Sequence, residues 1–131
     1  MAATEVRDDR NYTKEHEWAL ERPGEILVGI TAFAVDQLGD VTLVNLDVAP
    51  GDRVEAGKVF GTIESVKTLS DLYAPVSGRV VRVNQALEEA PELVNEDCWD
   101  RGWMLAIEPD GPPAALLTAD AYRKLVAENA H

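Results

Sequence analysis

Basic residues are scarce in this sequence, and their scarcity excludes several classes of partner. Only 12 lysines and arginines stand against 24 aspartates and glutamates, so the formal net charge is −12 at pH 7. A chain this acidic repels the phosphates of nucleic acids and the anionic lipids of a membrane surface, and its basic residues are scattered rather than clustered. The sequence therefore predicts a protein that binds neither nucleic acid nor membrane.

Cysteine and long apolar runs are also nearly absent. Cys98 is the only cysteine, which excludes an internal disulfide and a cysteine-rich zinc site. No apolar run approaches the roughly 20 residues of a membrane-spanning helix. The acids near the N-terminus are unlike a signal peptide or an arginine-rich, acid-poor transit peptide. These features predict a soluble protein of a bacterial-type cytoplasm, with the mitochondrial matrix less favoured.

Length and apolar content are those of one folded domain. A chain of 131 residues with 46% hydrophobic residues supplies material for a single core. We expect one domain over residues 1–131, with a flexible segment at 1–11, and a monomer. Apolar and polar residues alternate along several short segments, at 26–30, 44–48, 81–83 and 103–107. Alternation broken by proline and glycine turn signals predicts an all-β fold, a small sandwich or barrel.

Two segments have the pattern of helices. Thr31 is placed to cap a helix that runs to Leu38, where Gly39 provides the left-handed residue that often ends a helix. Thr118 is placed to cap a second, C-terminal helix, with Asp120 in its first turn. The apolar side chains of that helix fall on one face, which we expect to pack against the sheets: Tyr122, Leu125 and Val126.

The stretch between Asn84 and Arg101 carries acids and no base. Its acids are Glu88, Glu89, Glu92, Glu96, Asp97 and Asp100. We expect a solvated acidic loop, in which Pro91 opens a short helical turn. Cys98 lies in this stretch as a small hydrophobe, and the acids around it are expected to raise its pKa.

The most distinctive stretch surrounds Lys67. Residues 61–75, GTIESVKTLSDLYAP, predict two strands that meet near this lysine, although Val66-Lys67-Thr68 lacks the glycine, asparagine or aspartate that tight hairpin turns prefer. Gly51 and Gly78 flank the stretch beside proline-marked turns, where glycine provides positive φ angles. By composition alone, a lysine in an acidic protein is a solvated charge. The residues by themselves therefore leave the role of Lys67 open.

These residues resemble the biotinyl/lipoyl carrier domains, in which a modified lysine sits at an exposed hairpin tip. Further motifs narrow the resemblance to the glycine cleavage system H proteins, in the order YTKEHEW (12–18), VGIT (28–31), QLGD (37–40), ESVK (64–67), YAPVSG (73–78) and PELVN (91–95). The resemblance covers residues 12–126. It implies an all-β barrel-sandwich hybrid of two short antiparallel sheets, with Lys67 at a hairpin tip and short helices that include a C-terminal one.

The resemblance implies a carrier rather than an enzyme. Lipoic acid would be joined to Lys67 as an amide by a lipoyl or octanoyl transferase or a lipoate ligase, with Glu64, Ser65 and Val66 as the recognition motif. The arm would take an aminomethyl group from the pyridoxal-phosphate-dependent glycine decarboxylase (P protein). It would pass this group to the tetrahydrofolate-dependent aminomethyltransferase (T protein), and dihydrolipoamide dehydrogenase (L protein) would reoxidise it.

The resemblance also implies a shelter for the loaded arm. Glu17 and Asp71 would meet the positively charged amine at its end, whereas by composition both are ordinary surface acids. His16, between Glu15 and Glu17, is expected to pack structurally. The chain has no nucleophile-elbow serine motif, and no spacing around His16 matches a metal site.

Other functions stay open at this point. H-like lipoyl carriers also serve in lipoate relay and in sulfur oxidation, and these would not accept methylamine from glycine decarboxylase. An unmodified domain that docks partners through its acidic loop would tolerate Lys67→Arg. A hydrolase built on His16 would turn over substrate without any cofactor.

Overall fold

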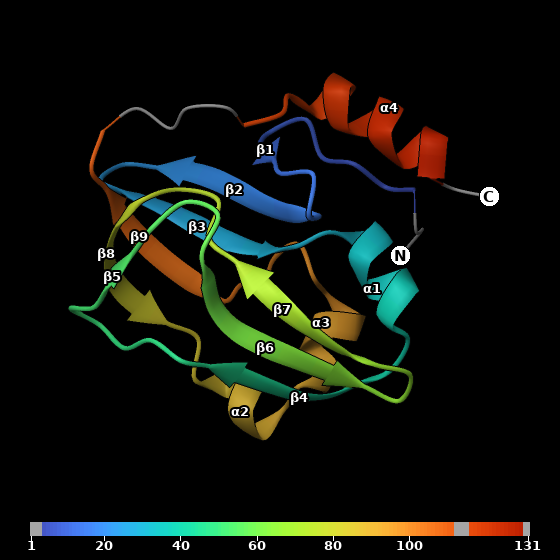
Figure 1. The fold of residues 1–131 in the computed structure, drawn as a ribbon, viewed down its shortest axis with the longest axis horizontal. Coiled ribbons are helices and arrows are strands. Elements are labelled where there is room, and N and C mark those ends of the chain that lie inside the picture. Colours follow the sequence, from blue (N-terminus) through green and yellow to red (C-terminus); the bar gives the residue numbers. More distant parts are fainter. Residues whose placement is uncertain (1–3, 112–115, 130–131) are drawn as a thin grey trace.

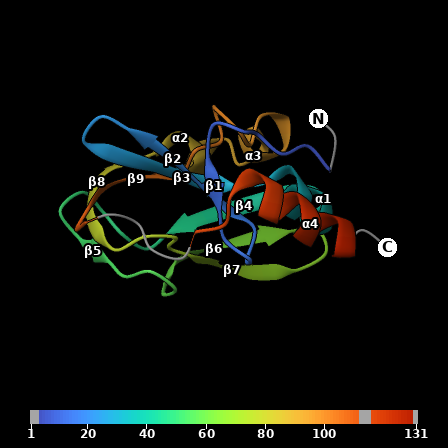
Figure 2. The same cartoon turned by 90° about the horizontal axis from the view of Figure 1, so that it is seen from above.

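Two antiparallel sheets stack face to face in the computed structural model, which describes residues 4–111 and 116–129. The strands are β1 (Asn11–Tyr12), β2 (Glu17–Arg22), β3 (Glu25–Ile30), β4 (Val41–Leu46), β5 (Arg53–Val54), β6 (Val59–Ser65), β7 (Leu69–Tyr73), β8 (Gly78–Val83) and β9 (Leu105–Pro109). The helices are α1 (Ala32–Leu38), α2 (Ala86–Glu89), α3 (Glu92–Glu96) and α4 (Ala119–Asn129). The larger sheet has the order β1-β2-β3-β9-β8-β5 and the smaller one β4-β6-β7 (Figures 1 and 2). The predicted all-β fold of two antiparallel sheets is confirmed.

The core lies between the sheets and extends to the outer face of the larger one. Leu105, Ala106 and Ile107 of β9 are all fully buried although successive side chains point to opposite faces, so both faces of this central strand are covered. On β3, Gly29 lies against the indole of Trp18, where an added Cβ atom would come within 2.4 Å of Trp18 Cζ2. The alternation of apolar and polar residues thus predicts where β3 and β9 lie in the sequence. Both strands are buried on two faces because they lie inside the larger sheet.

Both predicted helices form with the predicted caps. The Ala34 amide donates to Thr31 Oγ1 (3.2 Å), and Gly39 ends α1 at φ +77°. The Ala121 amide donates to Thr118 Oγ1 (3.1 Å) at the start of α4. The buried face of α4 packs against β1 through Tyr122, whose ring stacks on that of Tyr12 at 4.5 Å (Figure 1). None of the described helices is long and apolar enough to cross a membrane.

The expectation of a solvated loop between Asn84 and Arg101 is wrong. This stretch forms α2 and α3, both of which contact β4, and Pro91 precedes α3 as predicted. Its apolar side chains turn inward while the acids stay at the surface: Leu87, Val94 and Cys98 are fully buried. The pKa of Cys98 rises to about 12, chiefly because of burial and only secondarily because of nearby acids.

Two further details differ from expectation. The alternating segment 103–107 forms a strand only from Leu105 onward: Trp103 precedes β9 and is half-buried, with the Arg82 guanidinium 5.1 Å from its ring centroid. Gly51 has the expected positive φ of +98°, but Gly78 is required for a different reason. A Cβ atom at Gly78 would lie 2.1 Å from the carbonyl oxygen of Glu108, so close pairing of β8 with β9 excludes a side chain there.

Residues 4–10 belong to the segment 1–11 that is expected to be flexible, and several of them contact the rest of the fold. Arg10 is buried, with its guanidinium 4.6 Å from the ring centroid of Trp18 and 5.3 Å from that of Trp99. Its N–H groups donate to the Asp9 carboxylate and to the Trp99 carbonyl. Residues 1–3 lie outside the described residues, and the flexibility of residues 1–11 stays a prediction.

We expect Gly29→Ala to lower the free energy of unfolding by about 3 kcal/mol, because the new methyl group overlaps a fully buried indole. Gly111→Ala is the control, since no heavy atom of the described residues, its chain neighbours aside, lies within 4 Å of the Cβ position there. Chemical denaturation measures both. An unchanged midpoint for Gly29→Ala would contradict the close packing of Trp18 on β3.

Candidate functional site

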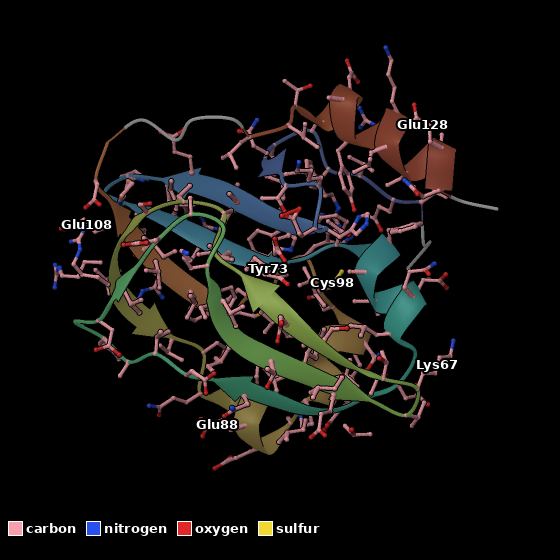
Figure 3. All side chains as sticks on the ribbon, in the orientation of Figure 1. Lys67, Tyr73, Glu88, Cys98, Glu108 and Glu128 are labelled. Carbon is pink, nitrogen blue, oxygen red and sulfur yellow. The ribbon has the colours of Figure 1, made fainter. Side chains whose placement is uncertain are left out.

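Lys67 stands at the turn of the hairpin that β6 and β7 form. Val66, Lys67 and Thr68 join the two strands and are exposed. Figure 3 shows the side chain of Lys67 at the periphery, near the C-terminal end of α1, whereas Cys98 lies inside. The structure thus places Lys67 at a hairpin tip, where a reagent or an enzyme can reach its amine.

Ser65 supplies the turn chemistry that was not predicted from the sequence. Its Oγ accepts hydrogen bonds from the amides of Lys67 and Thr68, both at 3.2 Å. Its own amide donates to the carbonyl of Thr68 (2.8 Å). A serine that bonds the backbone two or three residues ahead stabilises a turn without glycine or asparagine. The signal was present as a serine directly before the turn.

A second set of contacts ties the tip to the end of α1. The Val66 amide donates to the carbonyl of Asp40 at 3.0 Å. The Lys67 side chain runs beside Gly39, where an added Cβ atom would lie 3.3 Å from Lys67 Cε. The hairpin is therefore anchored to the segment 39–41 as well as closed on itself.

A cavity of about 180 Å³ opens beside the hairpin, along β7, the edge strand of the smaller sheet. Apolar side chains from three strands and α1 line it: Ile30, Ala34, Leu38, Ile63 and Leu72. Glu17 and Asp71, which are distant in sequence, lie in its wall. Asp71 is exposed, whereas Glu17 is only 2% exposed. The cavity thus combines an apolar lining with three carboxyl groups, since Glu15 lines it as well.

Burial controls the charge of Glu17. Thr13 Oγ1 donates to its Oε1 (2.7 Å) and the Tyr73 amide to its Oε2 (3.4 Å). These bonds lower its pKa, but burial outweighs them and raises the pKa to about 8. At neutral pH the carboxyl group therefore mostly holds its proton, and a cation that enters the cavity would favour the ionised form.

His16 lines the same cavity but is held by packing. Its Nδ1 lies 2.8 Å from the hydroxyl of Tyr122, which is 2.6 Å from Thr31 Oγ1. Its ring lies 4.7 Å from that of Phe33, and burial lowers its pKa. These contacts fit the structural role expected of His16.

The other predicted residues lie on the outer face of the hairpin. Glu64 is exposed between Leu43 and Leu69, its register partners on the neighbouring strands, and Val66 is 67% exposed. Of the motif Glu64-Ser65-Val66, only Ser65 uses its side chain within the fold. Among residues 4–111 and 116–129, no group of histidine, cysteine and acidic side chains converges as a metal site.

Comparisons with known proteins agree with this geometry. A family model described as glycine cleavage H-protein matches residues 10–129. The chain is 50% identical over 127 residues to the glycine cleavage system H protein of Anaeromyxobacter sp. (strain K), covering 95% of this chain and 98% of that one. It is 52% identical over 124 residues to the probable glycine cleavage system H protein of Natronomonas pharaonis, covering 94% and 98%. A crystal structure of a glycine cleavage system H protein from Mycobacterium marinum superposes with a TM-score of 0.84 at 38% identity, covering 96% of this chain and all of that one.

We predict that Glu17→Gln changes how stability depends on pH. Between about pH 4.5 and 8 the folded wild type holds a proton on Glu17 that the unfolded chain has lost, so its free energy of unfolding falls as pH rises. The slope reaches about 1.4 kcal/mol per pH unit, and the variant lacks it. Denaturation of the unmodified protein across this range measures the difference. Asp71→Asn controls for the loss of one acid, and parallel curves for wild type and Glu17→Gln would rule out the buried, protonated carboxyl.

We predict that Ser65→Ala loosens the turn at Lys67. Loss of the hydroxyl leaves two amides without their acceptor and costs about 1 kcal/mol of stability. Hydrogen exchange at Lys67 and Thr68 should become faster. Ser77→Ala is the matched control, because Ser77 Oγ accepts from the Ala56 amide away from this turn. Equal exchange at the turn in both variants would show that Ser65 does not hold it.

Proposed function

The chain belongs to the glycine cleavage H-protein family, and we propose that it is the lipoyl carrier of that system, with lipoic acid joined as an amide to Nζ of Lys67. The observation that carries the proposal is the placement of Lys67. It stands exposed on an anchored hairpin turn, beside an apolar cavity with three acids. Lysine suits this attachment because its primary amine forms the amide and its stem lengthens the arm.

The cavity fits an arm with an apolar stem and a cationic end. Its lining is mostly apolar, and its acids are Glu15, Glu17 and Asp71. When bound, the dithiolane of lipoic acid accepts two electrons and a carbon fragment, which no side chain does as readily. The fragment proposed as cargo is an aminomethyl group, whose amine is positively charged at neutral pH.

Glu17 and Asp71 have different roles in this proposal. Glu17 holds its proton in the buried wall and releases it when the ammonium group enters, so that a charged pair forms out of contact with water. Asp71 contributes negative charge at the exposed rim. The apolar lining keeps water from the cargo.

The proposed partners follow from the carrier role. The arm visits glycine decarboxylase, the aminomethyltransferase and dihydrolipoamide dehydrogenase, and the tether raises the local concentration of the cargo at each. The carrier itself catalyses none of these steps. We propose that the lipoyl or octanoyl transferase, or the lipoate ligase, contacts Glu64 and Val66 on the outer face of the hairpin, where both are exposed. A monomeric state and a cytoplasmic location stay predictions.

The relatives favour glycine cleavage over lipoate relay or sulfur oxidation, because each one compared above bears the glycine cleavage name. Loading distinguishes these pathways directly. The lipoylated protein should accept methylamine from glycine in the presence of glycine decarboxylase. Failure to accept it would favour one of the other lipoyl pathways.

We predict a single lipoyl mass increment, confined to Lys67, in protein produced with lipoate in a lipoylation-competent host. Lys67→Arg should gain none, because arginine does not form the amide. Lys58→Arg should be modified like the wild type, and intact mass with fragment localisation measures all three. If Lys67 stays bare while a known lipoyl domain in the same cells is modified, the carrier function is wrong and an acidic docking domain takes its place.

A further inference from the structure

The side chain of Asn95, in α3, bonds the backbone on both sides of Asp40. Its Nδ2 donates to the carbonyl of Gly39 (2.9 Å), and its Oδ1 accepts from the amide of Val41 (2.8 Å). One amide group thus uses a donor and an acceptor on a three-residue segment, which fixes the orientation of both partners. Segment 39–41 is thus held by α3, which packs against β4 (Figure 1).

The same three residues hold the hairpin tip. Between the two residues that Asn95 binds, the carbonyl of Asp40 accepts from the amide of Val66, the residue before Lys67. The Lys67 side chain runs beside Gly39, where an added Cβ atom would meet it, and Val41 pairs with Ser65. Contacts therefore run without interruption from Asn95 through segment 39–41 to the turn.

The ladder between β4 and β6 is irregular here. Its register shifts between Val41 and Leu43, so that the pairing does not continue evenly to the tip. Ser65 closes the turn on itself but does not fix where the turn lies relative to the rest of the fold. The hydrogen bond from the Val66 amide to the Asp40 carbonyl ties the turn to the rest of the fold. The position of that carbonyl depends in turn on how firmly segment 39–41 is held.

We propose that Asn95 is a positioning residue for Lys67. By clasping segment 39–41 it fixes the place at which the hairpin presents the lysine to the enzyme that attaches lipoic acid. This role of Asn95 rests on the proposed function of Lys67. Asn95 does not need to touch the lipoyl arm for this role, because its side chain acts through the backbone of Gly39, Asp40 and Val41.

Asn95→Asp isolates this role. The carboxylate keeps the shape of the amide and the acceptor for Val41, but it places an oxygen against the carbonyl of Gly39, where the two repel. Asn84→Asp is the matched control. Asn84 is buried, and its Nδ2 donates to the carbonyls of Arg101 (3.0 Å) and Trp103 (2.8 Å), so the same chemical change is made away from segment 39–41.

The first measurement is amide hydrogen exchange at Val66 in the unmodified protein. We expect Asn95→Asp to raise the exchange rate there about tenfold, as for the loss of one hydrogen bond. Asn84→Asp should lower the thermal midpoint to a similar extent and leave exchange at Val66 as in the wild type. Asn95→Ala removes both bonds without adding a charge, so it gives the same local effect and serves if Asn95→Asp does not fold.

The second measurement is the steady-state kinetics of a lipoate ligase on the same variants. We expect Asn95→Asp to lower kcat/KM about tenfold through KM, because a misplaced hairpin is recognised less often but reacts normally once bound. Equal effects of the Asn84 and Asn95 variants on exchange and on KM would overturn the positioning role. Absence of lipoylation in every protein, wild type included, would overturn the function of Lys67, whereas exchange at Val66 would still decide the placement of the hairpin by Asn95.

Discussion

The smaller sheet ends at β7, and the site depends on how the outer edge of that strand is satisfied. An edge strand leaves backbone amides and carbonyls without partners from a neighbouring strand. Here the amide of Tyr73 donates to the carboxyl group of Glu17 from the larger sheet, and an apolar cavity lies along the rest of the edge. Glu17 and the cavity therefore lie along the open edge of the three-stranded sheet. The tip of the same hairpin carries Lys67, so the lysine and the cavity share one strand.

Basic residues are absent from the sequence stretches that form the helices and the strand near Lys67. Neither 23–52 nor 83–100 contains a lysine or an arginine, and these stretches supply α1, β4, α2 and α3. Lys67 therefore lies beside elements that carry no basic residue, and the strands it joins, β6 and β7, carry none either. Conversion of its amine to an amide removes the positive charge and leaves this side of the molecule more negative. Partner enzymes with basic docking surfaces would then meet the modified form more readily, through interactions that salt screens.

Local patterns predicted the parts of the fold that local interactions determine. The caps Thr31 and Thr118 locate α1 and α4, and alternation locates the strands. The acidity of stretch 84–101 predicts a solvated loop, whereas its apolar residues, such as Leu87, are buried in a stretch whose helices α2 and α3 contact β4. The motifs around Lys67 identified the hairpin, but not the serine that closes it. Burial of Glu17 arises from packing between distant segments, so no local pattern indicates it, and the resemblance to H proteins alone singled out that residue.

If the cavity shelters the proposed cargo, that cargo has to leave again, and the protonation of Glu17 then limits how tightly it is held. A carboxyl group with a pKa of about 8 has to lose its proton before it pairs with an ammonium group. At pH 7 that ionisation costs free energy on the order of 1 kcal/mol, which subtracts from the attraction between the two charges. A carboxylate that was already ionised would hold the amine about tenfold more tightly and release it correspondingly more slowly. In the proposed carrier role, burial of Glu17 would keep water from the cargo and, at the same time, keep its binding weak enough for a partner enzyme to remove it.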